Sequence, residues 1–236
     1  TFHMHPITSI VIAIAASTIL GVVIEKVAYT PLRKAPRLSL LITAIGISFL
    51  LENGAQLLFG ADTKSMDPIV TGQVMLGSLK ISKAALLTIA VTIVAMVALT
   101  LTVQKTKLGK AMRAVSEDKN AATLMGISVD RTITLTFAIG SALAAFASMF
   151  YGMTYVYIKP TTGAMPGIKA FTAAVFGGIG SIPGAMLGGI LLGLIEQLSK
   201  TYISTLWADA IVFAVLVVVL VVKPTGLLGK PMQEKV

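Results

Sequence analysis

Residues 108–127, LGKAMRAVSEDKNAATLMGI, form the most charged stretch of an otherwise apolar chain, with long apolar segments on both sides. We expect Leu108–Val115 to form a short amphipathic helix. Asp118 is typical of the residue that precedes a helix, because its carboxylate accepts hydrogen bonds from free N–H groups of the first turn. Gly126 suits the left-handed conformation that ends a helix, and Ile127 can pack back on its last turn. The stretch therefore predicts two short helices in a compact unit, which is typical of a mechanical contact between membrane spans.

The composition predicts an integral membrane protein. Of the 236 residues, 56% are hydrophobic and 12% are charged, and the mean hydropathy is +0.89. Water-soluble domains carry about 25% charged residues. The net charge of +9 would suit nucleic acid, but the basic residues flank apolar runs as anchors at a membrane face do, so we expect membrane lipid and no nucleic acid as a partner. The chain has no cysteine, which excludes disulfides and thiolate metal sites.

The start of the sequence predicts missing upstream residues. The chain begins at Thr1, and an apolar run begins as early as Pro6. Residues 1–5 contain neither Lys nor Arg, and no clear cleavage site follows, so a cleaved signal is not expected. We interpret the sequence as a fragment that lacks N-terminal residues.

Apolar runs predict an all-α fold, a polytopic transmembrane helical bundle that forms one domain over residues 1–236. A spanning helix needs about 20 apolar residues. Runs of this kind predict spans at residues 6–25, 38–59, 84–103, 132–158 and 207–222. Between the second and third spans, residues 69–82 predict a small β-hairpin that turns near Gly72 and Gly77.

Residues 168–200 predict one broken or re-entrant helix pair. The apolar run 168–176 is too short to span, and GGIGSIPG at 177–184 interrupts it before the helical pattern resumes. Irregular backbone at membrane depth is tolerated only where protein buries it or where it lines a cavity. Gly178 and Gly180 are therefore candidates for the translocation pathway.

The distribution of Lys and Arg predicts the orientation in the membrane. With these spans, one side carries six basic residues, Lys64, Lys80, Lys83, Lys159, Lys169 and Lys200. The other side carries thirteen, Lys26, Arg33, Lys34, Arg37, Lys105, Lys107, Lys110, Arg113, Lys119, Arg131, Lys223, Lys230 and Lys235. The loop 104–131 and the C-terminus are therefore expected in the cytoplasm. This requires that the 168–200 pair enters and leaves on the same outer side.

No pattern in the chain predicts an enzyme or a cofactor site. The glycines before Lys230 have the wrong spacing for a nucleotide-binding Walker A loop, and Pro231 follows where Ser or Thr is needed. No Ser/His or paired-Asp arrangement is present. His3 and His5 offer two metal ligands without a third, so no metal site is expected.

We single out three acidic residues in or beside the predicted spans, because carboxylates there are candidates for function. Glu196 shares a helix face with Gly189 and Gly193, so we expect it to face the bundle. Glu52 lies in the outward third of the second span, and Asp209 opens the last span. Glu196 and Glu52 are the candidates for a translocation pathway. The alternative for each is a structural role near an interface or against a neighbouring helix.

Four stretches resemble a known family of transporters. The sequence GKAMRAVSEDKNAATLMGI is similar to the cytoplasmic coupling motif of ABC importer permeases. Together with it, TFAIGSALAAFASMFYG (136–152), AFTAAVFGGIGSIPGAMLGG (170–189) and the ending KPTGLLGK resemble the branched-chain amino-acid permeases of the LivH type. The resemblance runs from about Glu25 to the C-terminus. The family has further N-terminal helices, in agreement with a missing start.

The resemblance implies a function and a set of partners. It implies a permease pair in the bacterial inner membrane, two ATP-binding cassette subunits that hydrolyse ATP, and a periplasmic substrate-binding protein. The expected function is import of branched-chain amino acids. Contact with the ATPases is implied for the matching motif positions, Gly109, Ala111, Arg113, Asp118, Ala121, Gly126 and Ile127.

Two alternatives stay open at this point. A permease for urea or short-chain amides belongs to the same family. An ion-coupled secondary transporter is the alternative from another class, and in it Glu196 or Glu52 would carry the coupling proton.

Overall fold

The computed structural model describes residues 6–33, 35–65, 70, 72–76 and 79–229. The chain forms two compact units, one of Thr1–Ile93 with Leu101–Thr162 and one of Val94–Thr100 with Gly163–Val236. The described residues are mostly helical, which confirms the all-α prediction. Several residues considered above lie outside the described residues: His3, His5, Lys34, Gly77, Lys230 and Lys235.

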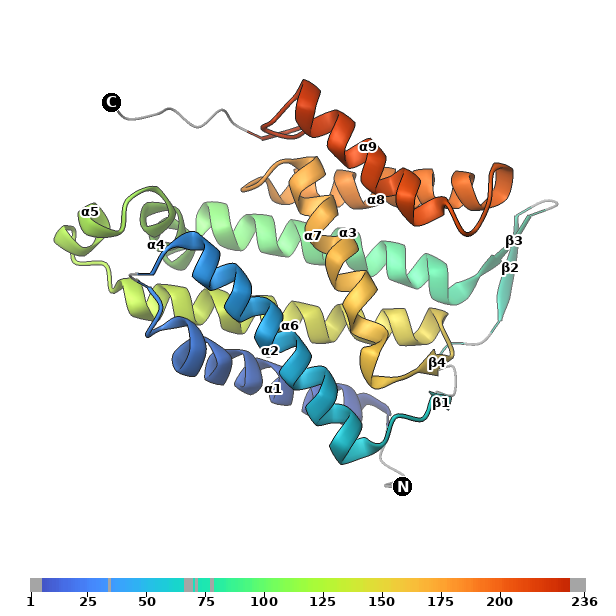
Figure 1. Ribbon diagram of the computed structural model, residues 1–236, viewed down its shortest axis with the longest axis horizontal. Helices are drawn as coiled ribbons and strands as arrows, with labels where there is room; N and C mark the ends of the chain where they lie inside the picture. The colour runs from blue at the N-terminus through green and yellow to red at the C-terminus, as the bar shows by residue number, and fades with distance from the viewer. Residues whose placement is uncertain (1–5, 34, 66–69, 71, 77–78, 230–236) are drawn as a thin grey trace. The chain divides into compact units, whose positions relative to one another are not determined.

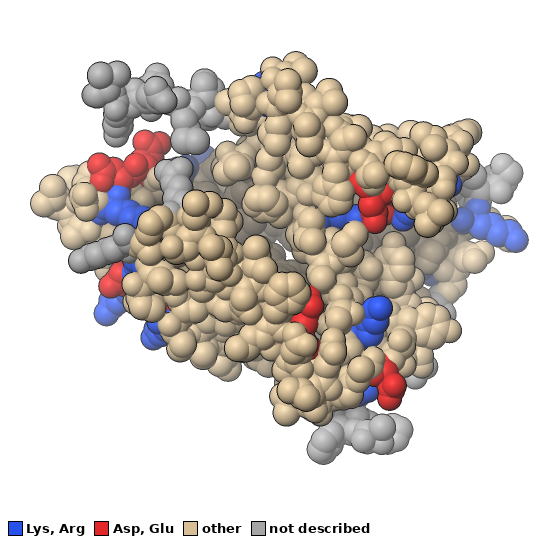
Figure 2. All heavy atoms as spheres, in the orientation of Figure 1, with Lys and Arg blue, Asp and Glu red and all other residues tan. Residues whose placement is uncertain are grey.

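Five of the described helices are long and apolar enough to cross a membrane: Thr8–Tyr29, Leu38–Phe59, Lys83–Lys105, Val129–Thr154 and Ile182–Tyr202. Large apolar side chains stay exposed on them, for example Leu57 at 88% and Leu58 at 80%. On the face drawn in Figure 2, charged side chains gather in small groups and broad areas carry none. Extended apolar surface of this kind marks contact with a membrane or a partner, and it confirms a polytopic membrane protein.

The first unit is organised around two helices, α1 (Pro6–Ile24) and α6 (Val129–Thr154), which pack along each other (Figure 1). Their contact is close because Gly21 lies against Ser141, where a Cβ would overlap the serine hydroxyl. Ser17 Oγ also donates a hydrogen bond to the Ser141 carbonyl, at 3.2 Å. Small residues thus let the two helices approach closely, as is typical of helix pairs in membranes.

The remaining elements of the first unit lie between these two helices in the sequence, except for one short strand that follows α6. They are the π-helical turn η1 (Glu25–Tyr29), α2 (Arg37–Phe59), most of α3 (Lys83–Lys105), α4 (Lys107–Glu117) and α5 (Lys119–Leu124). Four short strands complete it: β1 (Lys64–Ser65), β2 (Gln73–Leu76), β3 (Leu79–Ser82) and β4 (Tyr157–Ile158).

The strands form two antiparallel pairs at one end of the first unit (Figure 1). β2 pairs with β3, with Gln73 opposite Ser82, which confirms the predicted hairpin. Gly72 precedes β2 with φ +116° and does not lie in the turn between the strands. β1 pairs with β4, with Lys64 opposite Ile158, so the segments that follow α2 and α6 lie side by side.

Two predicted helix ends are wrong. The fourth span was expected to reach Ile158, but α6 ends at Thr154, because the chain becomes extended and pairs with β1. The first span was expected to end at Glu25, but the chain continues as a π-helical turn to Tyr29, closed by a hydrogen bond from Thr30 N to Glu25 O at 2.8 Å. A π-helical turn is rare and often lies at a functional site.

The second unit contains three helices, α7 (Ala164–Gly177), α8 (Ile182–Tyr202) and α9 (Ala208–Val222). The 3₁₀ turn η2 (Pro160–Gly163) directly precedes α7. α7 and α8 pack together, and α9 packs against both. Their shared core consists of Ala173, Phe176, Leu192 and Val212. The predicted break therefore separates two helices that pack on each other, although the first of them begins at Ala164 and not at Ile168.

The break itself is encoded by glycine and serine. Gly178 and Gly180 have φ of +110° and +90°, which favour glycine. Ser181 then begins α8, because its Oγ accepts a hydrogen bond from Gly184 N at 3.1 Å. The turn between α7 and α8 thus follows from local chemistry.

The end of the chain packs onto this break through the backbone. Leu227 N and Leu228 N donate hydrogen bonds to Phe176 O and Gly177 O, both at 2.9 Å. A Cβ on Gly178 would overlap the backbone nitrogen of Gly229. The break therefore lies beside the segment that follows α9, and Gly178 is covered by backbone.

A pair of glycine substitutions tests this contact. Both Gly178 and Gly180 have positive φ, but a Cβ at Gly180 would meet no atom within 4 Å. We expect Gly178→Ala to lower the free energy of unfolding more than Gly180→Ala does, by about 1–3 kcal/mol, because only the first overfills a packed contact. The measurement is the thermal midpoint of the purified protein in detergent. Equal midpoints for the two variants would contradict the contact between Gly178 and Gly229.

Candidate functional site

The segment that contains α4 and α5, residues 107–127, begins with a tight corner. Thr106 Oγ1 accepts a hydrogen bond from Gly109 N at 3.1 Å and begins α4. Gly109 is buried, and a Cβ there would overlap the Val103 carbonyl at the end of α3. The corner thus requires glycine, which gives Gly109 a structural reason that the sequence pattern alone did not show.

Both predicted ends of α5 are confirmed. Asp118 Oδ1 accepts hydrogen bonds from Asn120 N at 2.8 Å and Ala121 N at 3.1 Å. At the other end Gly126 has φ +78°. Gly126 N donates to Thr123 O and Ile127 N donates to Ala122 O, both at 3.0 Å, which is the Schellman pattern of a helix stop. The α4–α5 segment is therefore held by hydrogen bonds at each of its turns.

The segment is anchored on one face and exposed on another. Val115 and Ala122 are buried, at 7% and 3% exposure. Leu124 and Met125 are 88% and 82% exposed, although both are large and apolar. The other motif positions form the rest of the surface: Arg113, Asp118, Ala121 and Gly126 are exposed, and Ala111 and Ile127 are half-buried. An exposed apolar tip on a rigid segment is suited to contact with another protein.

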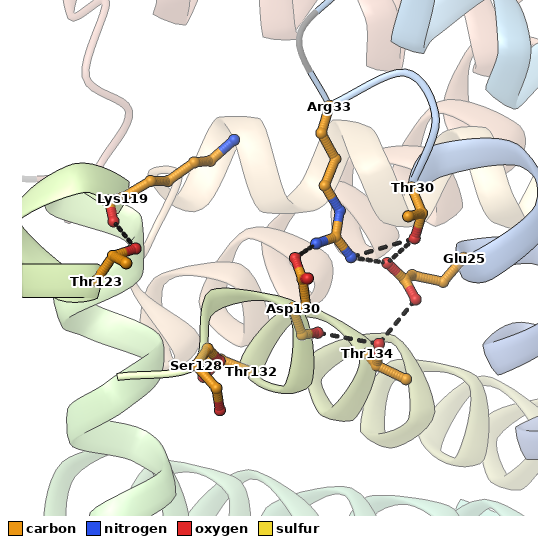
Figure 3. A network of polar contacts seen from close by, with 9 residues as sticks. All are labelled: Glu25, Thr30, Arg33, Lys119, Thr123, Ser128, Asp130, Thr132 and Thr134. Carbon is orange, nitrogen blue, oxygen red and sulfur yellow. Dashed lines mark hydrogen bonds and ion pairs between the residues drawn. The ribbon is translucent and has the colours of Figure 1, made fainter. Parts of the chain in front are cut away.

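A buried carboxylate lies in the first unit, in the turn that follows α1 (Figure 3). Glu25, in η1, is completely buried. Its Oε1 accepts hydrogen bonds from Arg33 Nη2 and from Thr30 Oγ1, the latter at 3.0 Å. Its Oε2 accepts a hydrogen bond from Thr134 Oγ1 of α6 at 2.8 Å. Burial of a charge is costly unless it is paired and hydrogen-bonded, and Glu25 meets both conditions.

Arg33 joins two elements by means of its two terminal nitrogens (Figure 3). Nη2 pairs with Glu25, while Nη1 pairs with Asp130 in the first turn of α6. The planar guanidinium is suited to such a fork, because its donors point in fixed directions. The loop that carries Arg33 is itself compact, since Leu32 N donates to Tyr29 O at 3.1 Å and Ala35 N donates to Leu32 O at 2.9 Å.

A second group of charges joins the three helices of the second unit. Lys169 Nζ of α7 lies 2.9 Å from Glu196 Oε1 of α8 and 2.7 Å from Asp209 Oδ1 of α9. Lys200 Nζ, one turn beyond Glu196, lies 2.5 Å from the same Oε1. Glu196 therefore pairs with charges on its own helix and on a neighbour. This arrangement agrees with the structural alternative for Glu196 and Asp209.

The other pathway candidates have separate surroundings within their own units. Glu52 is half-buried in α2 and forms no ion pair among the described residues. Gly178 is covered by the backbone of Gly229, whereas the space beside Gly180 is open.

Comparison with known proteins identifies the family. Residues 1–220 match the family described as "Branched-chain amino acid transport system / permease component". The chain belongs to this family. No solved structure matches the chain.

Three relatives of the permease show how far the similarity extends. The chain is 47% identical over 229 residues to the high-affinity branched-chain amino acid transport system permease protein LivH of Salmonella typhimurium. The matched region covers 95% of this chain and 74% of the relative. The LivH protein of Escherichia coli is 46% identical with the same coverage. The permease protein BraD of Pseudomonas aeruginosa is 45% identical over 95% of this chain and 76% of its own length. The resemblance noted from the sequence motifs is thereby confirmed.

The charge clusters of this permease were not predicted from the sequence. From the sequence, Glu25 was only the last residue of a predicted span, Arg33 a basic residue that flanks it, and Lys169 an outer basic residue. One signal was available, since a carboxylate at the end of an apolar run is followed eight residues later by an arginine between Pro31 and Pro36. The pairing of Arg33 with Asp130 and of Lys169 with Asp209 had no such local signal, because the partners come from distant parts of the chain.

Proposed function

We propose that this permease is the membrane subunit of an ATP-driven importer that moves branched-chain amino acids across the bacterial inner membrane. The observation that carries the proposal is the identity of 45% and 47% to the BraD and LivH permeases, over 95% of the chain. A urea or short-chain amide permease is the alternative within the family. Identification of the ligand that the partner substrate-binding protein retains, by screening leucine, isoleucine, valine, urea and amides, separates the two.

The proposal assigns ATP hydrolysis to partner subunits. The chain lacks a Walker A pattern, so two ATP-binding cassette subunits would supply the energy. A second permease subunit would complete the membrane part, and a periplasmic binding protein would deliver the substrate. The α4–α5 segment is the proposed ATPase contact, with Leu124 and Met125 as its apolar tip. Gly109, Asp118, Gly126 and Ile127 would fix its shape, and Ala111, Arg113 and Ala121 would add to its surface.

The shape of this segment supports a role in transmission of force. Asp118 fixes the start of α5, and Gly126 fixes its end by left-handed backbone. A segment with fixed turns transmits a displacement, whereas a flexible loop absorbs it. A movement of the ATPases would therefore tilt α3 and α6, which this segment joins.

Gly126 provides the test of the ATPase contact. Valine at φ +78° is strained by about 1–2 kcal/mol, and this strain acts alone because a Cβ at Gly126 would meet no atom within 4 Å. We expect Gly126→Val to insert in the membrane at normal levels but to lose ATPase binding and transport. Gly126→Asn is the matched control, since Asn tolerates the left-handed conformation. Co-purification of the ATPases and uptake of leucine are measured. If Gly126→Val binds its ATPases and transports as wild type does, this segment is not the docking element.

The proposed orientation places the α4–α5 segment and the C-terminus in the cytoplasm. Within the first unit, the β1–β4 pair brings Lys64 next to the segment that precedes Lys159, which supports one common side for these two residues. We expect single cysteines at Lys64 and Lys159 to react with an impermeant thiol reagent in intact cells. Cysteines at Lys119 and Lys230 should react only after permeabilisation. Labelling at Lys230 from outside would contradict this orientation.

Glu196 separates an ATP-driven permease from an ion-coupled carrier. Glu196, Glu52 and Gly180 remain proposed residues of the translocation pathway. For Gly178, the contact with Gly229 favours a structural role over a place in the pathway. In an ATP-driven permease Glu196 has no proton to carry, and its ion pairs with Lys169 and Lys200 support a structural task. A proton-coupled carrier must bind and release a proton at a carboxylate in each cycle.

Glu196→Gln distinguishes the two mechanisms, because glutamine accepts hydrogen bonds but does not titrate. We expect vesicles that contain the variant, its ATPases and the binding protein to retain ATP-dependent leucine accumulation within about threefold of wild type, since polar contacts between membrane helices contribute only about 0.6 kcal/mol on average. Accumulation that requires a proton gradient, ignores ATP and disappears in Glu196→Gln would establish the carrier instead.

A further inference from the structure

We propose that Glu25 and Arg33 are positioning residues that fasten α1 to the first turns of α6, so that α1 moves together with the α4–α5 segment. The inference rests on the proposed function and extends it, because α1 is not one of the two helices that this segment joins directly. It is carried by the contacts of Figure 3 and by the packing of α1 along α6.

The first step is the short connection from α5 to α6. The Schellman hydrogen bonds at Gly126 and Ile127 fix the end of α5, and α6 begins at Val129. Asp130 lies in the first turn of α6, so a displacement of α5 displaces it. Thr134 follows one turn later on the same helix face.

The second step is the link from α6 to the buried charge of η1. Thr134 donates its hydroxyl hydrogen bond to Glu25 Oε2 at 2.8 Å, and Asp130 pairs with Arg33. The Asp130 side chain is 83% exposed, so its ion pair alone is weak. The Thr134 bond reaches a carboxylate that is fully buried, and it is the stronger link of the two.

The third step is a continuous line of contacts between α6 and α1. Asp130, Thr134, Phe137 and Ser141 follow one another at helical spacing and share one face of α6. Phe137 packs against Tyr29 of η1 with ring centroids 5.1 Å apart, and Ser141 meets α1 at Ser17 and Gly21. The polar link is thus one end of a contact that extends along both helices.

The buried charge explains why this contact persists during movement. If α6 moved away from α1, Glu25 would lose one of its donors, and Arg33 would be drawn between two separating carboxylates. Loss of a hydrogen-bond donor from a buried charged acceptor is unfavourable. Movement of the two helices as one body avoids that cost, whereas sliding of one past the other does not.

The test disconnects α6 without leaving a buried charge unpaired. The double variant Asp130→Asn with Thr134→Val removes the Arg33–Asp130 ion pair and the Thr134 hydrogen bond, and it leaves the Glu25–Arg33 pair and the Thr30 hydrogen bond in place. The matched control is Asp62→Asn with Thr136→Val, which makes the same chemical changes at exposed positions outside the cluster. The readouts are leucine uptake per ATP hydrolysed and ATPase co-purification, in proteoliposomes that contain the ATPases and the binding protein.

We expect the double variant to bind its ATPases as wild type does, while uptake per ATP falls by about fivefold or more, the lower limit of typical coupling between sites. The control should keep the wild-type ratio. An unchanged ratio in the double variant would overturn the inference, and so would loss of ATPase binding, because the residues would then act on docking. A wild-type complex without ATP-driven leucine uptake would refute the proposed function instead.

A cross-link provides an independent test. Tyr29→Cys with Phe137→Cys places the only two thiols of the chain on η1 and α6, within reach of a short bifunctional thiol reagent. We expect the cross-linked protein to retain transport, and we expect the cross-link to restore the ratio of uptake to ATP hydrolysis in the Asp130→Asn, Thr134→Val background. A cross-link that blocks transport would show that the two helices must slide, and it would overturn the inference.

Discussion

A carboxylate that is fully buried in an apolar bundle requires a counter-charge that stays in place, and Glu25 imposes this requirement on the first unit of the permease. Arg33 supplies the charge, and the compact loop around it keeps the guanidinium in position. The remaining lone pairs of Glu25 are satisfied by Thr30 and Thr134. One buried charge therefore determines where three elements meet: the end of α1, the loop before α2 and the start of α6.

The features that could be predicted from the sequence are those with local causes. Asp118 and Gly126 fix the two ends of α5 through their own side chain and backbone, and both were predicted correctly because no distant residue is needed. The same holds for the apolar runs that form the long helices α1, α2, α3 and α6 and for the glycine break between α7 and α8, whereas α9, expected as a span over 207–222, has only 15 residues. The fold class and the turns of the α4–α5 segment were thus available from the sequence.

The features that could not be predicted depend on which elements pack together. Asp130 is about one hundred positions from Arg33, and nothing in either segment specifies the other. Lys169 was an outer basic residue in the sequence, whereas packing places it between Glu196 and Asp209. The predicted end of α6 was wrong for the same reason, because residues 157–158 are extended only through their pairing with Lys64 and Ser65. A glycine with positive φ can line a cavity or lie in a packed contact, and the sequence does not distinguish the two. At Gly178 the backbone of Gly229 lies close enough to make it a packed contact.

The short sequence separation of Glu25 and Arg33 has a consequence for biosynthesis. A membrane protein enters the bilayer segment by segment, and α1 leaves the ribosome before α6 is made. A carboxylate whose counter-charge came from α6 would wait unpaired during this interval. Arg33 lies only eight residues after Glu25, so the pair can form while α1 is still the newest helix of the nascent chain. Asp130 and Thr134 are synthesised later and join a pair that is already neutral. The order of synthesis thus matches the order in which the charges need one another.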